Sequence, residues 1–227
     1  LTDDQHEAIA CRFSTPSIYP AQRIIGGTKA LHHIADSAES PPKADGWHTD
    51  ISWLPEPPSH AFLSAVQIPE FGGDTIWASL FAAYDALSEP MQALCRNLTA
   101  MHAPSPEQLE AFRRSGNFGP DIAEKVAAIF QPVEHPLVRT HPVSGRQALY
   151  LSGFMTRIVG LNSAESDMLL HYLNSLLDNP NLQVRWTWRE GDFAIWDEAS
   201  TNHRALSDHY PQDRKMRRCT VDGGRPF

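Results

Sequence analysis

Residues 182–197, LQVRWTWREGDFAIWD, contain two short runs rich in aromatic and β-branched residues, which we interpret as two strands. The segment RRCTV, residues 217–221, predicts a third strand near the C-terminus. Residues 61–68, AFLSAVQI, and residues 74–79, DTIWAS, predict two more, on either side of a Phe-Gly-Gly turn. Many short strands separated by turn residues favour a β-sandwich or a jelly roll.

The other segments predict peripheral helices and a few further strands. Thr2-x-x-Gln5 resembles a capping box at the start of a first helix, and five leucines form one face of a late helix ended by Asn179-Pro180. The expected helices are 2–13, 80–99 with an interruption at 88–90, 105–116 and 163–178; the expected strands are 135–142 and 147–152 as a hairpin, 156–161, and one near Ile24 in an otherwise irregular stretch from 14 to 46. We therefore expect residues 1–227 to form a single, mainly β domain.

Composition excludes several classes of protein. The 227 residues are 41% hydrophobic and 20% charged, which is typical of a globular domain rather than a disordered one. The net charge of −8 and the lack of a basic block argue against a nucleic-acid partner, and no apolar run is long enough to span a membrane. Cys11, Cys95 and Cys219 are widely spaced, which fits a reducing cytoplasm. Because the chain begins at Leu1, we expect it to lack an N-terminal segment.

The stretch GWHTDISW, residues 46–53, contains the triplet His48-x-Asp50. On a strand, residues i and i+2 point to the same face, so both side chains could reach one metal ion. His203, just after the strand DFAIWD, could supply the third ligand from a neighbouring strand or from the end of one. Two imidazoles and one carboxylate are the facial triad of non-haem Fe(II) enzymes. A triplet of this kind can equally be a polar pair that only supports a strand.

Two arginines follow His203 and extend this interpretation. A ferrous site of this kind takes a 2-oxo acid as co-substrate, and a planar guanidinium suits its distal carboxylate. In an extended chain Arg214 and Arg218 share a face while Arg217 points the other way. One of the pair could bind the co-substrate and the other an anionic substrate.

Several motifs, in order along the chain, resemble the taurine dioxygenase family of iron(II)- and 2-oxoglutarate-dependent oxygenases. The resemblance covers most of the chain from about Trp47 to Phe227. The motifs are WHTDISW, GGDTIWAS, HPLVRTHPVSGRQALYLSGFMTRIVGL, VRWTWREGDFAIWD and TNHRALSDHYPQDRKMRRCTVDGGRPF.

The resemblance implies a double-stranded β-helix, or jelly roll, that uses Fe(II), 2-oxoglutarate and dioxygen. It implies the following roles: His48, Asp50 and His203 as iron ligands, Thr75 and Arg214 as 2-oxoglutarate contacts, and Arg218, Phe154 and Tyr19 as substrate contacts. The implied reaction hydroxylates the carbon next to the heteroatom of taurine or another alkylsulfonate. Sulfite and an aldehyde are released together with succinate and CO2. Homodimers or homotetramers are common among such proteins.

The substrate pocket departs from the taurine-specific pattern. Ala44 stands where those members have a polar residue, and Pro16 stands where a histidine would precede Tyr19 by three positions. Alkyl sulfate esters and aryloxyalkanoates are therefore alternative substrates.

Six other histidines, namely His60, His102, His135, His141, His171 and His209, have no comparable setting, and we interpret them as structural or surface residues. Two alternatives of another class are a zinc-dependent hydrolase, which would need neither Arg214 nor dioxygen, and a non-catalytic jelly-roll binding protein.

Overall fold

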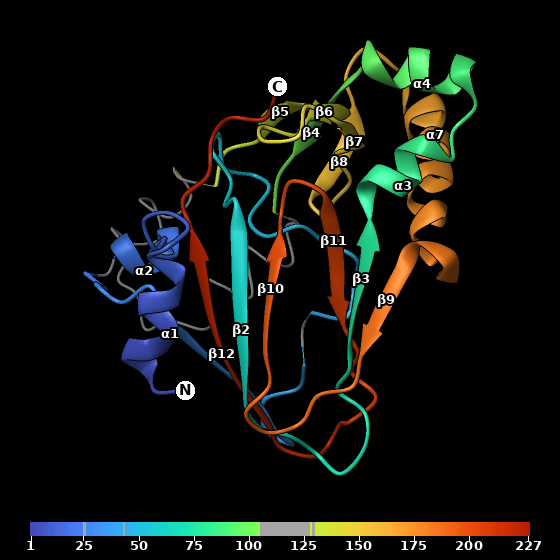
Figure 1. Ribbon diagram of the computed structural model, residues 1–227. Helices are drawn as coiled ribbons and strands as arrows, with labels where there is room; N and C mark the ends of the chain where they lie inside the picture. Colours follow the sequence, from blue (N-terminus) through green and yellow to red (C-terminus); the bar gives the residue numbers. More distant parts are fainter. Residues whose placement is uncertain (25, 43, 105–127, 129) are drawn as a thin grey trace.

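The computed structural model describes residues 1–24, 26–42, 44–104, 128 and 130–227, and its centre is a pair of antiparallel sheets (Figure 1). The larger sheet has the strand order β1-β12-β2-β10, and the smaller one has the order β11-β3-β9. Their strands are β1 (His32–Asp36), β2 (His60–Gln67), β3 (Thr75–Ser79), β9 (Gln183–Trp186), β10 (Phe193–Asp197), β11 (Thr201–Ala205) and β12 (Arg214–Val221).

The strands β2 and β12 are central because apolar groups cover both of their faces. On one face, Leu63 and Met216 belong to a buried cluster that includes Trp196, and Trp77 of the smaller sheet packs against it, 5.5 Å from the Trp196 ring centroid. On the other face, Phe62 packs with Ala10 of the N-terminal helix. This two-sided burial explains why AFLSAVQI is almost continuously apolar instead of alternating.

A second layer of helices and short strands extends the fold beyond the smaller sheet (Figure 1). One cluster of buried apolar residues holds this layer together. Leu169, Leu173 and Leu177 belong to it and form the predicted apolar face of the late helical segment. The elements are α3 (Leu80–Asp85), α4 (Glu89–Arg96), β4 (Thr99–His102), β5 (Val133–Pro136), β6 (Val138–Thr140), β7 (Gln147–Leu149), β8 (Met155–Ile158), α7 (Ser163–Ser175) and the 3₁₀ turns η1 (Leu176–Asp178) and η2 (Pro180–Leu182).

The N-terminal stretch confirms one expectation and corrects another. The helix α1 (Asp3–Ala10) begins with the predicted capping box of Thr2 and Gln5. The predicted strand near Ile24 is wrong, because Pro20–Ile24 form the short helix α2, whose first turn accommodates proline. The strand of this region is β1, which pairs with the distant β12. The predicted helix at 105–116 lies outside the described residues.

None of the helices in the described part of the chain is both long and apolar enough to cross a membrane. The three cysteines are free thiols; Cys95 and Cys219 are buried, whereas Cys11 is exposed.

Candidate active site and metal centre

The three predicted ligands meet beside two cavities, and His48 lines both of them. His48 and His203 form an isolated bridge in which the backbone N–H of each donates to the carbonyl oxygen of the other at 2.9 Å. Asp50 follows in a turn, and its Oδ1 lies 3.7 Å from Nε2 of each histidine. Candidate ligand atoms of the three side chains all lie within 4.8 Å of one another. The structure therefore brings the three predicted ligands together.

The route to this convergence differs from the one that the sequence suggested. The triplet does not lie on a regular strand, because Asp50 is in a turn and Ile51 has a φ of 38°. His203 lies on β11, which fits the expected position on a neighbouring strand, although the bounds of that strand were not predicted. The two-residue period of a strand is therefore the wrong reason for the meeting of His48 and Asp50. A backbone bridge and a tight turn bring them together instead.

The protonation states of the three side chains suit the binding of a cation. Burial lowers the pKa of His48 and lowers that of His203 well below its usual range, so both imidazoles are neutral at neutral pH. Burial alone would raise the pKa of Asp50, but the Arg218 guanidinium and the two imidazoles lower it to about 2. The Nδ1–H of His48 donates to the Gly46 carbonyl at 2.8 Å, which leaves the Nε2 lone pair for a ligand bond. Two imidazole nitrogens and one ionised carboxylate are a donor set that ferrous iron accepts.

A buried carboxyl group, that of Glu198, contacts Asp50 and was not predicted from the sequence. Glu198 accepts the backbone N–H of Asp50 at 2.9 Å and the indole N–H of Trp196 at 2.7 Å. Burial, together with the nearby Asp50 carboxylate, raises the pKa of Glu198 well above its usual range. The Trp196 ring also lies 4.8 Å from the His203 ring. Only the tertiary structure brings Glu198 into contact with Asp50, because the two are far apart in sequence.

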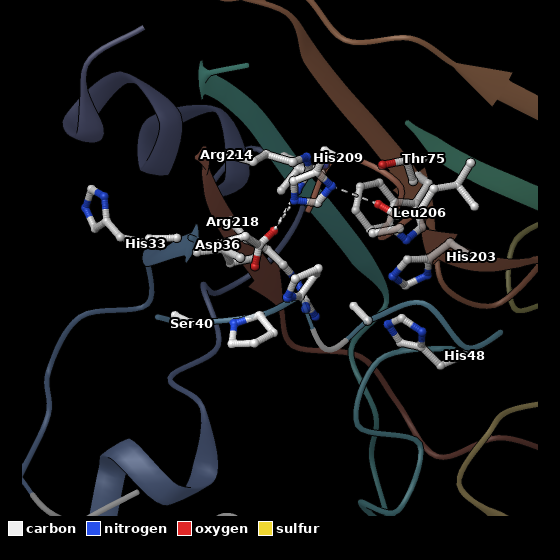
Figure 2. Close-up of a pocket in the computed structure, with 18 residues that line it drawn as sticks. His33, Asp36, Ser40, His48, Thr75, His203, Leu206, His209, Arg214 and Arg218 are labelled. Atoms are coloured by element: carbon white, nitrogen blue, oxygen red, sulfur yellow. Dashed lines mark hydrogen bonds and ion pairs between the residues drawn. The ribbon is translucent and has the colours of Figure 1, made fainter. Parts of the chain in front are cut away.

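A cavity of about 330 Å³ extends from the two histidines to Arg214 (Figure 2). Arg214 is 4% exposed, and its Nε–H donates to the Gly73 carbonyl at 3.0 Å. Its second terminal nitrogen is buried and has no hydrogen-bond partner among the described residues. Thr75 lines the same cavity, and its hydroxyl oxygen accepts the indole N–H of Trp188 at 2.9 Å. The hydroxyl proton of Thr75 has no acceptor among the residues that the structure describes, so it can donate to a ligand. A carboxylate in this cavity could accept from both Thr75 and Arg214.

The glycine pair in the GGDT motif has a steric role at this cavity. Gly73 has a φ of +72°, and a Cβ at this position would lie 2.9 Å from Cδ of Arg214. The Gly73 N–H donates to the Asp208 carboxylate at 2.8 Å, which fixes the turn. Glycine is therefore required both for the backbone conformation and for the close approach of Arg214.

Two further residues belong to the cavity, and the sequence analysis did not select them for it. His209, which we had interpreted as structural, lines the cavity together with Asp36. The Nε2 atom of His209 is 3.3 Å from Asp36, whose carboxylate is also 3.8 Å from Arg214 (Figure 2). Asp36 stands opposite Arg214 in the β1–β12 register. No sequence signal was available, because β1 itself was not predicted.

A second cavity, of about 480 Å³, lies beside the first and contains the predicted substrate contacts. Tyr19, Phe154 and Arg218 line it together with Asp50. Arg218 forms an ion pair with Asp50 and lines both cavities. His32, the register partner of Arg218 on β1, also lines this second cavity, and its ring centroid is 6.0 Å from that of Tyr19.

Of the two residues that depart from the taurine-specific pattern, Ala44 lines the cavities and Pro16 pairs with a strand. Ala44 lines both cavities, so the missing polar side chain does alter the site. Pro16 instead forms an isolated bridge with Val221.

Comparison with known proteins decides the family. A model described as taurine catabolism dioxygenase TauD, TfdA family, matches residues 1–220. The chain belongs to this family. It is 35% identical to an alpha-ketoglutarate-dependent sulfate ester dioxygenase of Pseudomonas putida, over 100% of the chain and 75% of that protein. It is 33% identical to an alkylsulfatase of Acinetobacter baylyi (strain ATCC 33305 / BD413 / ADP1), over 98% of the chain and 70% of that protein.

A solved structure supports the fold of this TauD/TfdA member. A taurine dioxygenase from Burkholderia xenovorans matches with a TM-score of 0.80 and 32% identity, over 100% of this chain and 75% of that one. The prediction of a mainly β jelly roll with peripheral helices is thereby confirmed. The predicted enzyme class is confirmed as well: the chain is a 2-oxoglutarate-dependent non-haem iron dioxygenase, with iron, 2-oxoglutarate and dioxygen as its reactants and cofactors.

Proposed function

We propose that this dioxygenase oxidises a small organic anion that carries a sulfo group, an alkylsulfonate or an alkyl sulfate ester, at the carbon next to the heteroatom. The observation that carries the proposal is the position of Arg218. Its guanidinium contacts Asp50 and lines both the cavity of Arg214 and the cavity of Tyr19 and Phe154. An anion bound to Arg218 would therefore have its neighbouring carbon beside the metal centre.

His48, Asp50 and His203 would hold ferrous iron. Iron with 2-oxoglutarate and dioxygen supplies an oxidant strong enough to hydroxylate a C–H bond, and 2-oxoglutarate leaves as succinate and CO2. A carbon that carries both a hydroxyl and a sulfo group loses the latter. An alkylsulfonate would thus yield an aldehyde and sulfite, and a sulfate ester would yield an aldehyde and sulfate.

The protein's contribution is binding and orientation. Arg214 and Thr75 would hold the distal carboxylate of 2-oxoglutarate, and Arg214 would use the nitrogen that has no partner in the described part of the chain. Arg218 would fix the sulfo group so that one C–H faces the metal centre. A zinc-dependent hydrolase would leave the buried donors of Arg214 and Thr75 without a purpose, which is why the oxygenase is preferred.

His32 is a candidate second donor to the sulfo group. Burial, with the Arg218 and His33 charges, lowers the pKa of His32, so its imidazole is neutral at neutral pH. The structure shows a ring contact with Tyr19 for His32 but no hydrogen bond from its side chain to another described residue. A neutral N–H next to one guanidinium suits a singly charged sulfonate or sulfate ester better than a doubly charged phosphate.

The first experiment is an anaerobic titration of the metal-free protein with Fe(II) and 2-oxoglutarate. We expect the weak visible charge-transfer band of a chelated 2-oxo acid, fading when oxygen is admitted. Alkylsulfonates, alkyl sulfate esters and aryloxyalkanoates are then compared for substrate-dependent succinate formation. Stimulation by aryloxyalkanoates alone would refute the sulfo-group assignment, and the absence of a band would refute the roles of Arg214 and Thr75.

The substrate assignment has a matched pair of variants on β1. His32→Gln removes the proposed donor, and we expect KM for the sulfo substrate to rise about tenfold or more, since a hydrogen bond to a charged group contributes about 1.5–3 kcal/mol. His33→Gln changes the next residue, which also lines both cavities but whose side chain is exposed and pairs with Asp3. Equal KM values for the two variants would contradict the role of His32.

We also propose a location and an assembly state. Three free cysteines fit a cytoplasmic location. Assembly into homodimers or homotetramers is a prediction that size measurement in solution would test.

A further inference from the structure

The end of the first cavity farthest from the metal centre contains three side chains of linked charge (Figure 2). Arg214 of β12 lies 3.8 Å from the Asp36 carboxylate of β1. The same Asp36 oxygen lies 3.3 Å from Nε2 of His209. All three side chains are largely buried: Arg214 is 4% exposed, His209 is 1% exposed and Asp36 is 12% exposed.

The charges within this cluster already cancel, so no positive charge is left to balance a bound anion. Arg214 is positive and Asp36 is negative, so with a neutral His209 the cluster carries no net charge. The distal carboxylate of 2-oxoglutarate would add a second negative charge beside Asp36. Two carboxylates that share one buried guanidinium repel each other, and that repulsion favours the protonated form of a neighbouring imidazole.

The hydrogen-bonding geometry of His209 points the same way. Its Nδ1–H donates to the Leu206 carbonyl oxygen at 3.2 Å, and its Nε2 lies 3.3 Å from the Asp36 carboxylate without a hydrogen bond to any described residue. Both neighbours are acceptors. The neutral ring with its proton on Nδ1 satisfies the Leu206 carbonyl, and a second proton, on Nε2, would face the Asp36 carboxylate.

The other charged groups near this cluster are already engaged. Asp208, next to His209 in the chain, accepts the Gly73 N–H and lies 4.0 Å from Arg185. Asp74 accepts from Arg185 at 2.6 Å and from Thr187. Among the residues that the structure describes, the groups facing His209 are therefore Asp36 and, beyond it, Arg214.

We propose that binding of 2-oxoglutarate takes up a proton on His209, so that His209 and Arg214 together balance the Asp36 carboxylate and the distal carboxylate of the co-substrate. The inference rests on the proposed placement of that carboxylate at Arg214. It makes His209 and Asp36 positioning residues of the co-substrate site. The affinity for 2-oxoglutarate should fall as the pH rises, because a binding step that takes up protons weakens when protons are scarce.

The test measures protons rather than turnover. Binding to the protein loaded with Mn(II), a redox-inert substitute for iron, is followed by calorimetry at about pH 7.5 in two buffers of different ionisation enthalpy. The ligands are 2-oxoglutarate and 2-oxopentanoate, which chelates metal identically but ends in a methyl group. We expect 2-oxoglutarate to take up a larger fraction of one proton than 2-oxopentanoate. Equal uptake by the two acids would overturn the proposal.

Variants assign the proton to its site. His209→Gln should abolish the difference between the two acids, whereas His33→Gln should retain it, since His33 lies apart from the cluster (Figure 2). Asp36→Asn should also abolish the difference while retaining binding, because the full charge of Arg214 then becomes available to the co-substrate. A difference that persists in both His209→Gln and Asp36→Asn would refute the assignment. Failure of 2-oxoglutarate to bind the unaltered protein would instead refute the proposed co-substrate site, and the inference with it.

Discussion

Replacing Arg218 with methionine would remove the guanidinium that pairs with Asp50 while retaining a side chain of similar length. Asp50 is 3% exposed and Arg218 is 27% exposed. Removing one partner of a buried ion pair leaves an uncompensated charge, which costs about 3–5 kcal/mol. Because Arg218 is partly exposed, we expect the lower end, about 3 kcal/mol of unfolding free energy in the metal-free protein. For a chain of this size that is a fall in Tm of about 6–12 °C.

A divalent cation at the triad should restore most of this loss, because it supplies positive charge to the same carboxylate. The assay is thermal unfolding with a chelator and again with saturating Mn(II). The matched control is Arg217→Met on the same strand. Arg217 pairs with the half-exposed Asp3, so its loss should cost no more than about 1 kcal/mol and should not depend on metal.

Two results would refute this reasoning. If Arg218→Met and Arg217→Met are equally stable without metal, the Arg218–Asp50 pair does not compensate a buried charge. If Mn(II) leaves the gap between the two variants unchanged, Asp50 is not at a metal site.

Two further predictions concern backbone space and pH. Gly73→Ala should weaken 2-oxoglutarate binding more than tenfold in a charge-transfer titration by displacing Arg214, whereas Gly160→Ala, with φ +85° but open space around it, should not. Burial lowers the pKa of His102 to about 3, so its contribution to stability is present above its unfolded pKa of 6.5 and is lost as the pH falls below it. Between pH 7 and about pH 5, the free energy of unfolding measured with denaturant should fall by about 2 kcal/mol through His102. The fall should be smaller by about this amount in His102→Gln, but not in His171→Gln, which changes an exposed residue.

Much of the fold and part of the site could be predicted from sequence because their signals are local. Alternating or apolar runs predicted β2, β3, β10 and β12, and the spacing of leucines predicted α7. The strand period placed Arg214 and Arg218 on one face of β12, and both line the first cavity. The motifs that resemble the family singled out the three candidate ligands, which the structure brings together.

The residues that sequence reasoning missed are those whose neighbours depend on strand register. The β1–β12 pairing sets Asp36 opposite Arg214 and His32 opposite Arg218. Because β1 was not predicted, neither pair could be inferred, and His209 was interpreted as structural. Register between segments far apart in sequence is set by how both strands pack, not by either strand alone.

The sequence by itself determined which chemistry this chain carries: the types and order of the candidate ligands, the two arginines and the glycine pair. Only the tertiary structure decided how these groups share charge. A carboxylate, an imidazole and a guanidinium influence one another through distance and burial, and neither quantity exists until strands separated by most of the chain are paired.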